Sequence, residues 1–169
     1  MEKDYGKGVD IWAAGVIFGE LLNTLEQKCA NPKKRTCLFP GRYCFPLSPN
    51  ETVDCDEQGI PVSHRNDQLE KIFNMIGSPS ESDLSFVTDD KALIYLHMFP
   101  EKPAANLREK FPVGSDDALR ILKSMLQFNP FNRASADELI NDAYFDDVRR
   151  FSKAYDAPEQ IGFAFEESK

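Results

Sequence analysis

Four cysteines, two histidines and several pairs of adjacent aspartates are the side chains of this 169-residue chain that could support catalysis or bind a metal. A structural zinc ion takes four thiolate or imidazole ligands, usually from closely paired positions. Cys29, Cys37, Cys44 and Cys55, together with His64, are irregularly spaced and include no C-x-x-C pair. We therefore predict free thiols, with a zinc site as the alternative.

The motifs of nucleotide-binding and hydrolytic enzymes are missing from the sequence. Gly6-Lys7-Gly8 would need a further glycine where Ile11 stands to form a dinucleotide loop. The sequence contains no P-loop, no G-x-S-x-G and no H-E-x-x-H. His64 and His97 stand alone, which is typical of packing or surface histidines. We predict no catalytic residue, no ATP-binding residue and no metal site in this chain.

The elements that position these side chains are predicted to be helices. Residues 9–25 are apolar nearly all round, which favours a helix buried on every side. Ser135 and Glu138 form a capping box, and Asp67 and Ser115 are typical N-cap residues. Helices are predicted over 9–25, 67–76, 81–87, 90–98, 115–129 and 135–143. No segment alternates like a strand, so the predicted class is all-α.

Composition and charge exclude several partner classes. The chain has 20 basic and 28 acidic residues and a formal net charge of −8. Such an acidic chain is unsuited to nucleic acid and to anionic membranes, and would attract basic partners. The apolar stretch from Val9 to Leu22 is interrupted by Asp10 and Glu20, and no signal-peptide pattern is present. An intracellular location, in the cytoplasm or nucleus, is expected.

Several short motifs occur in a fixed order along the chain. They are D-x-W-x-x-G at Asp10, Trp12 and Gly15, L-F-P-G at 38–41, D-Q-L at 67–69, I-G-S-P-S at 76–80, and M-L-Q-F-N-P at 125–130 with Arg133 three residues later. This series resembles the C-terminal lobe of the MAP kinases, a family of eukaryotic serine/threonine protein kinases.

The resemblance implies an all-α fold that is the helical half of the C-terminal lobe of a protein kinase, with a long irregular insertion. Residues 1–149 would form this partial kinase domain, and 150–169 a C-terminal extension. The insertion lies at about 26–63, of which 42–63 exceed the family's usual link between F-P-G and D-Q-L. A MAP-kinase-type insert is expected at about 80–105.

The resemblance also implies the function of a longer parent protein. A MAP kinase transfers phosphate from ATP, with magnesium, to serine or threonine of proteins in intracellular signalling. The family's ATP-binding and catalytic motifs precede the matched segment and are missing here. The chain alone is therefore expected to bind neither ATP nor magnesium and to be inactive, with the missing N-terminal half as its partner. The alternative is a stand-alone non-catalytic docking module derived from a kinase lobe.

The resemblance also implies roles for individual residues. Asp10 resembles the aspartate that accepts hydrogen bonds from the catalytic loop, and Trp12 and Gly15 belong to the same motif. Arg133 resembles the buried arginine that pairs with the glutamate of A-P-E. A first-turn carboxylate and a surface arginine are the alternatives for Asp10 and Arg133.

Two candidate docking surfaces complete the predictions. Leu69 and Tyr95 match part of the pocket that binds aromatic docking motifs in the family. Asp156 and Glu159 resemble its acidic patch, which binds basic peptides of substrates or regulators. Ordinary solvated surface is the alternative for the acidic patch.

Overall fold

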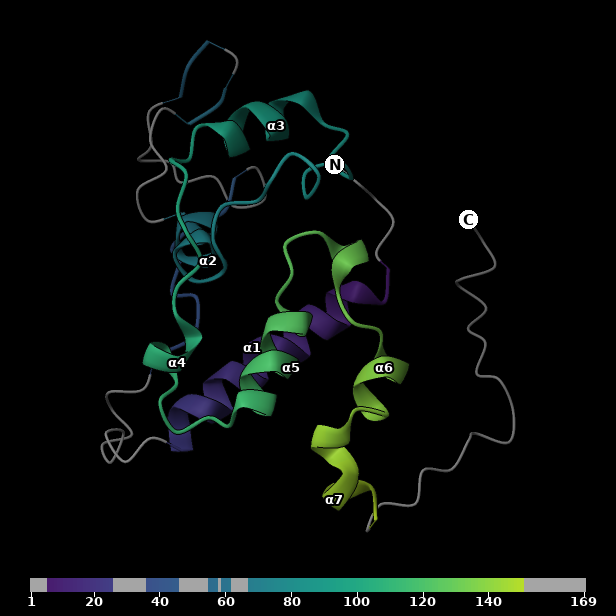
Figure 1. Cartoon of the computed structure of the whole chain (residues 1–169). Helices are drawn as coiled ribbons and strands as arrows, with labels where there is room; N and C mark the ends of the chain where they lie inside the picture. The colour runs from purple at the N-terminus through teal and green to yellow at the C-terminus, as the bar shows by residue number, and fades with distance from the viewer. Residues whose placement is uncertain (1–5, 26–35, 46–54, 58, 62–66, 151–169) are drawn as a thin grey trace, which may run out of the picture.

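The regular elements of the chain are helical (Figure 1), in a computed structural model that describes residues 6–25, 36–45, 55–57, 59–61 and 67–150. In chain order these are α1 (Gly8–Leu25), α2 (Gln68–Ile76), α3 (Asp90–His97), α4 (Leu107–Lys110), α5 (Asp116–Met125), the 3-10 turn η3 (Pro130–Asn132), α6 (Ala136–Ile140), the 3-10 turn η4 (Ala143–Phe145) and α7 (Asp146–Arg149). Within these residues, extended pairing is limited to isolated bridges at Tyr43–Asp67 and Cys55–Pro61. The all-α prediction is confirmed.

The long helix α1 packs against α5, and small residues make the close approach possible (Figure 1). Gly15 and Gly19 are buried on the packed face of α1. A Cβ atom on Gly15 would lie 2.9 Å from the Cβ of Met125, and one on Gly19 would lie 2.9 Å from a methyl carbon of Leu38. Glycine at these positions therefore lets α5 and the 38–39 segment reach the backbone of α1.

The apolar core of the described residues is divided into three clusters. The largest joins α1 and α5 to Leu38, Phe39, Met75 and Phe111. A second is mostly aromatic and joins α2 to α3 through buried side chains at Ile60, Phe73, Tyr95 and Phe99. A third anchors α6 to α5 through Ile121, Met125 and Leu139.

Among the described residues, only one face of α1 is covered, so the expectation that it is buried on every side is not met there. Ile17, Leu21 and Leu25 are 61%, 56% and 61% exposed, and Val9 is 44% exposed. Of the helices that the structure describes, α1 alone is long and apolar enough to cross a membrane, a test that core helices also pass. Ile17, Leu21 and Leu25 repeat at every fourth position and Val9 lies two such steps before Ile17, so these side chains form an apolar stripe along the helix.

Helix boundaries set by capping side chains are predicted well. The Asp67 side chain accepts from Leu69 N, the Ser115 side chain accepts from Ala118 N, and the Ser135–Glu138 capping box is formed. α6 ends at Ile140 rather than near 143, because Asp142 caps the following 3-10 turn. The prediction of a helix at 81–87 is wrong. This segment forms turns, since one buried side chain, Leu84, gives too little burial to offset helix nucleation.

The turn at residues 81–86 is tied to the end of α3 by a histidine–carboxylate pair. His97 Nε2 lies 3.1 Å from Glu81 Oε1, and His97 Nδ1 lies 2.8 Å from the Leu93 carbonyl oxygen. The hydrogen bonds to Glu81 and to Leu93 raise the pKa of His97 above its usual 6.5. Because the folded-state pKa is raised, this pair stabilises the fold fully below about pH 6.5, and the stabilisation is lost as pH rises through the folded pKa.

The pKa of His97 should depend on its contact with Glu81. We expect its imidazole to titrate above pH 6.5 in an NMR pH series, and Glu81→Gln to move the midpoint down towards 6.5. Glu109→Gln, a neutralisation on α4, serves as the matched control and should leave the midpoint unchanged. An unperturbed midpoint in the wild-type chain would show that the pair does not persist in solution.

Candidate functional site

Arg133 is held half-buried at the end of η3 by backbone carbonyl groups and an aromatic ring. Its guanidinium donates to the carbonyl oxygens of Gly8 at 2.6 Å, Gln127 at 2.8 Å and Phe128 at 3.1 Å. The guanidinium carbon lies 4.8 Å from the ring centroid of Trp12, in cation–π contact. Burial lowers the pKa of Arg133 from its usual value. Among the described residues, no carboxylate forms an ion pair with it.

An apolar hollow of about 350 Å³ opens beside this arginine. Its lining residues come from α1, α2, the 81–86 turn and η3, and they are Val9, Trp12, Ile72, Phe86, Phe128, Pro130 and Arg133. Arg133 is the only charged residue of this lining. The hollow is therefore suited to an apolar segment that also presents a carboxylate to the guanidinium.

The residues predicted to form the kinase-lobe motif are only partly brought together. Trp12 stacks on Phe39, with ring centroids 5.8 Å apart, and also contacts Arg133. Gly15 lies one turn further along the same helix, against α5. Asp10 lies exposed in the first turn of α1, and its carboxylate accepts no hydrogen bond within the described part of the chain. Its expected role towards a catalytic loop stays a prediction.

A buried carboxylate at the start of α2 connects three segments. Asp67 is 0% exposed, and its oxygens accept hydrogen bonds from Leu69 N at 2.7 Å and from the Tyr95 hydroxyl at 2.6 Å. The amide of Phe45 lies 3.5 Å from the same carboxylate. Burial and the hydrogen bond to Asp67 raise the pKa of Tyr95, so this hydroxyl stays protonated and donates. Asp67 thus joins α2, α3 and the insertion.

The predicted docking residues Leu69 and Tyr95 lie in one cluster, but Tyr95 is a core residue. Its side chain is 1% exposed, and the ring of Phe45 covers it with centroids 4.8 Å apart. Leu69 packs half-buried against the same aromatic cluster. Docking on the Tyr95 ring therefore requires Phe45 to leave. Tyr43 and Phe45 were not among the predicted site residues, although aromatic residues two positions apart in an extended segment are a usable signal.

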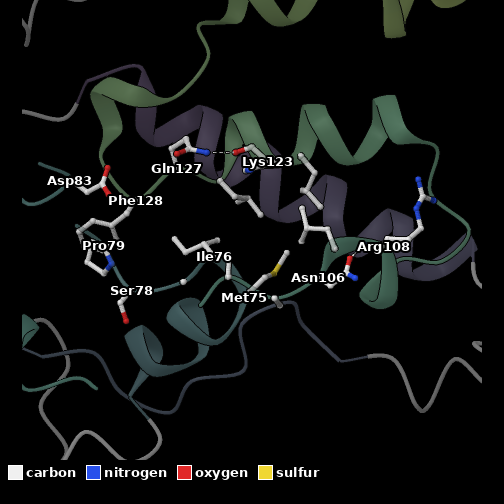
Figure 2. A pocket seen from close by; sticks show the side chains of 16 residues that line it. Met75, Ile76, Ser78, Pro79, Asp83, Asn106, Arg108, Lys123, Gln127 and Phe128 are labelled. Atoms are coloured by element: carbon white, nitrogen blue, oxygen red, sulfur yellow. Dashed lines mark hydrogen bonds between the residues drawn. The ribbon is translucent and has the colours of Figure 1, made fainter. Parts of the chain in front are cut away.

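A second hollow, of about 380 Å³, lies between the end of α2, the 104–108 segment and the end of α5. Figure 2 shows Met75 and Ile76 on one side of it and Lys123 and Gln127 on the other. Gln127 Nε2 donates to the Lys123 carbonyl oxygen at 2.7 Å. No predicted site residue lines this pocket. Every buried side-chain nitrogen and oxygen of the described residues has a hydrogen-bond partner, so no orphaned polar group marks a ligand.

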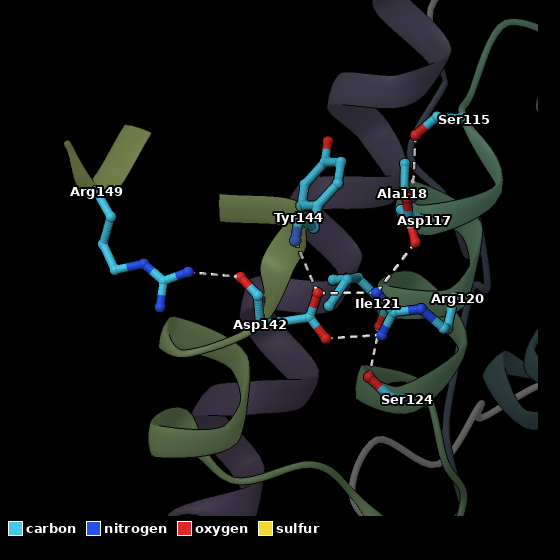
Figure 3. Close-up of polar contacts among 9 residues, drawn as sticks. All are labelled: Ser115, Asp117, Ala118, Arg120, Ile121, Ser124, Asp142, Tyr144 and Arg149. Carbon is cyan, nitrogen blue, oxygen red and sulfur yellow. Dashed lines mark hydrogen bonds and ion pairs between the residues drawn. The ribbon is translucent and has the colours of Figure 1, made fainter. Parts of the chain in front are cut away.

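The C-terminal turns are fastened to α5 by an arginine–aspartate cluster (Figure 3). The Arg120 guanidinium binds both carboxylate oxygens of Asp142, at 2.7 and 2.8 Å, and reaches Asp117 at 3.2 Å. Arg149 donates to the Asp142 carbonyl oxygen at 2.9 Å. The hydrogen bonds from Arg120 hold the pKa of Asp142 at about 2. Since Asp142 also caps η4 through Tyr144 N, the cluster is structural.

The remaining predicted ligands do not assemble into a site within the described residues. Cys37, Cys44 and Cys55 are thiols rather than members of a disulfide, and no group of three histidine, cysteine or acidic side chains is close enough to hold a metal there. Cys29 and His64 lie outside the described residues. The same is true of Asp156 and Glu159, so the acidic docking patch stays a prediction.

Comparison with known proteins gives the family relation. No family model matches the chain. Mitogen-activated protein kinase 13 of Arabidopsis thaliana is 30% identical over 165 residues, which is 98% of this chain and 37% of the relative. Mitogen-activated protein kinase mpk-1 of Caenorhabditis elegans is 31% identical over 144 residues, 85% of this chain and 25% of the relative. The chain is homologous to the mitogen-activated protein kinases. It spans about a third of the length of the curated MAP kinases that it matches.

The homology and the fold agree. The described residues are helical and lack a sheet, as expected of the helical C-lobe region of a MAP kinase. The motifs that predicted the relation fall at packed positions: Trp12 and Gly15 on the covered face of α1, Asp67 at the cap of α2, and Arg133 beside Trp12.

Proposed function

We propose that this chain is the substrate-lobe scaffold of a MAP-kinase-like serine/threonine kinase and is inactive alone. The observation that carries the proposal is Arg133, a half-buried cation without a carboxylate partner in the described residues, beside an apolar hollow. A preceding part of the kinase domain would fill the hollow and supply the carboxylate. The parent protein would bind ATP and magnesium and act on intracellular protein substrates.

The exposed stripe of α1 supports the same proposal. Val9, Ile17, Leu21 and Leu25 extend the apolar surface from the hollow along the whole helix. Continuous apolar surface of this kind is uncommon on monomeric proteins and marks an interface. The preceding half of the kinase domain would cover both the stripe and the hollow.

Reconstitution of a kinase domain from two separate chains tests whether this chain acts as the scaffold. The chain would be mixed with the part of the Arabidopsis mitogen-activated protein kinase 13 that precedes the matched region, and association measured by calorimetry. We expect a complex, and phosphorylation of a generic basic substrate with ATP and magnesium only when both parts are present. Absence of both association and activity would contradict the proposal and leave the stand-alone docking module.

The substitution Arg133→Gln tests whether the other part of the kinase domain supplies a carboxylate to Arg133. Loss of one member of a buried ion pair costs about 3–5 kcal/mol, so association should weaken by about 100-fold or more. Arg133→Lys should recover only part of the loss, since it keeps the charge without the planar fork. Arg150→Gln, on an exposed side chain that pairs with Asp147, is the matched control. Equal affinity for wild type and Arg133→Gln would contradict the assigned role.

A further inference from the structure

The hollow of about 380 Å³ between α2 and α5 has the size of a small-molecule site and is separate from the interface proposed above. No residue of α1 lines it, and Phe128 is the only residue that it shares with the hollow beside Arg133. A preceding part of the kinase domain could therefore cover the stripe of α1 and the hollow beside Arg133 while this space stays open.

One wall of the hollow is held in place by the backbone at the end of α2. The Ala105 amide donates to the Met75 carbonyl oxygen at 3.0 Å. Gly77, at a φ of 86°, permits a close approach here, because a Cβ atom on it would lie 2.9 Å from the Ala104 nitrogen. The 104–108 segment is thereby fixed against α2, and the space between it and α5 is pre-formed.

The walls of the hollow indicate a ligand with an apolar and aromatic body. Leu122 and Leu126 on α5 are 0% and 3% exposed, and Met75 on α2 is 3% exposed. Figure 2 shows Met75 on the α2 side of the hollow and Phe128 at one end. A thioether and an aromatic ring both favour contact with a further aromatic group. Since every buried side-chain nitrogen and oxygen of the described residues is hydrogen-bonded, no such group is left to bind a polar ligand body.

The charged residues of the lining indicate the sign of the ligand's polar end. They are Asp83, Arg108 and Lys123. Asp83 accepts a hydrogen bond from the Ser80 hydroxyl at 2.6 Å, and Arg108 pairs with Asp116. Lys123 is exposed near the end of α5 and has no ion-pair partner within the described part of the chain. The charge that these residues leave uncompensated is therefore a cation, which complements a carboxylate.

We propose that this hollow binds a small arylalkyl carboxylate, with its aromatic ring and alkyl chain between α2 and α5 and its carboxylate at Lys123. The ligand would contact α2, the 104–108 segment and α5 together. Because it binds the folded chain, it would also stabilise the fold. The site involves neither Arg133 nor the exposed face of α1, so it stands whether or not the chain completes a kinase.

The test uses phenylhexanoate, a phenyl ring on a six-carbon carboxylic acid, and NMR chemical-shift mapping on the full chain. A ligand of about 14 non-hydrogen atoms with the efficiency usual for drug-sized molecules has a Kd of about 1 mM. We expect this Kd, with shifts at the Met75 methyl group and the Lys123 amide. The neutral analogue phenylhexanamide should bind about 3- to 5-fold more weakly, a modest difference because Lys123 is exposed.

Two substitutions, each with a matched control, separate the charge from the cavity. Lys123→Gln should lower the affinity for the carboxylate to that for the amide, whereas Lys110→Gln, at an exposed lysine outside the lining, should leave it unchanged. Ala104→Phe, at an exposed position of the lining, should fill the hollow and weaken both probes by about 10-fold or more. Ala136→Phe, exposed on α6, is the control for the added bulk.

Three results would overturn the proposal. Shifts confined to α1 or to the hollow beside Arg133 would place the ligand elsewhere. Equal affinity of the wild-type chain for the carboxylate and the amide would refute the role of Lys123. An absence of shifts at ten times the expected Kd would refute the site itself. Since the shift mapping uses the wild-type chain, none of these results depends on the folding of a variant or on reconstitution of a kinase.

Discussion

Asp67→Ala is expected to lower the free energy of unfolding by about 3 kcal/mol, one of the two largest effects on stability that we predict. The substitution removes the N-cap of α2, worth about 1 kcal/mol, and leaves the buried Tyr95 hydroxyl without its acceptor, which costs about 1–3 kcal/mol. It also frees the amide of Phe45. Urea unfolding followed by circular dichroism would measure the loss as a lower midpoint with an unchanged slope.

A double-mutant cycle separates the cap from the buried hydroxyl. Tyr95→Phe in the Asp67→Ala background removes the orphaned hydroxyl, so the double variant should be more stable than the sum of the single effects indicates. Asp67→Asn, which keeps the shape and one acceptor oxygen, is the conservative control and should lose less. A change below about 0.5 kcal/mol for Asp67→Ala would contradict the role of Asp67 as the connection between α2, α3 and the insertion.

Gly41→Ala is expected to cost about 3 kcal/mol, because there is no room for a methyl group. A Cβ atom on Gly41 would lie 2.5 Å from the Cα and 2.9 Å from the Cβ of Gln68, and the former is backbone that cannot rotate away. The Gln68 side chain also donates to the Phe39 carbonyl oxygen at 2.8 Å, so the whole contact would have to shift. Overpacking of this kind typically costs about 1–3 kcal/mol and sometimes more.

The same urea titration would measure Gly41→Ala against Gly6→Ala. Gly6 has no atom within 4 Å of an added Cβ and should tolerate alanine within about 0.5 kcal/mol. We also expect Gly41→Ala to loosen residues 43–45, since the bridge to Asp67 begins two residues later. If the two glycine variants are equally stable, the close approach of the 38–41 segment to α2 does not exist in solution.

The MAP kinase relation could be predicted because it depends on local motifs in order along the chain. Each motif serves a need set by its own turn or by the neighbouring helix: Gly15 permits the contact with α5, Asp67 caps α2, and Asn129-Pro130 caps and starts a 3-10 turn, although α5 already ends at Met125 rather than at the predicted 129. The same contacts, caps and turns are required wherever the fold occurs, so the motifs occur with it. The boundary at residues 149 and 150, the acidic patch and the role of Asp10 stay predictions, because they depend on segments outside the described part of the structure.

The aromatic packing between α2 and α3 could not be predicted in full, since it depends on contacts between residues far apart in sequence. Tyr95 has the side chain of a surface docking residue, but Phe45, fifty positions earlier, covers it. The apolar character of α1 likewise predicted complete burial, although the described residues cover only one of its faces. Composition sets how much apolar surface must be covered, and only the packing decides which segment covers it.

By itself, then, the sequence determined the helical class, the N-terminal caps of α2, α5 and α6, and the kinase family. These follow from periodicity, capping side chains and motif order, all of which act over a few residues. The tertiary structure alone decided that carbonyl groups and Trp12 hold Arg133, and that Phe45 of the insertion covers Tyr95. The reason is physical: a buried charge or ring is satisfied by whichever group folding brings near, and sequence separation puts no limit on that choice.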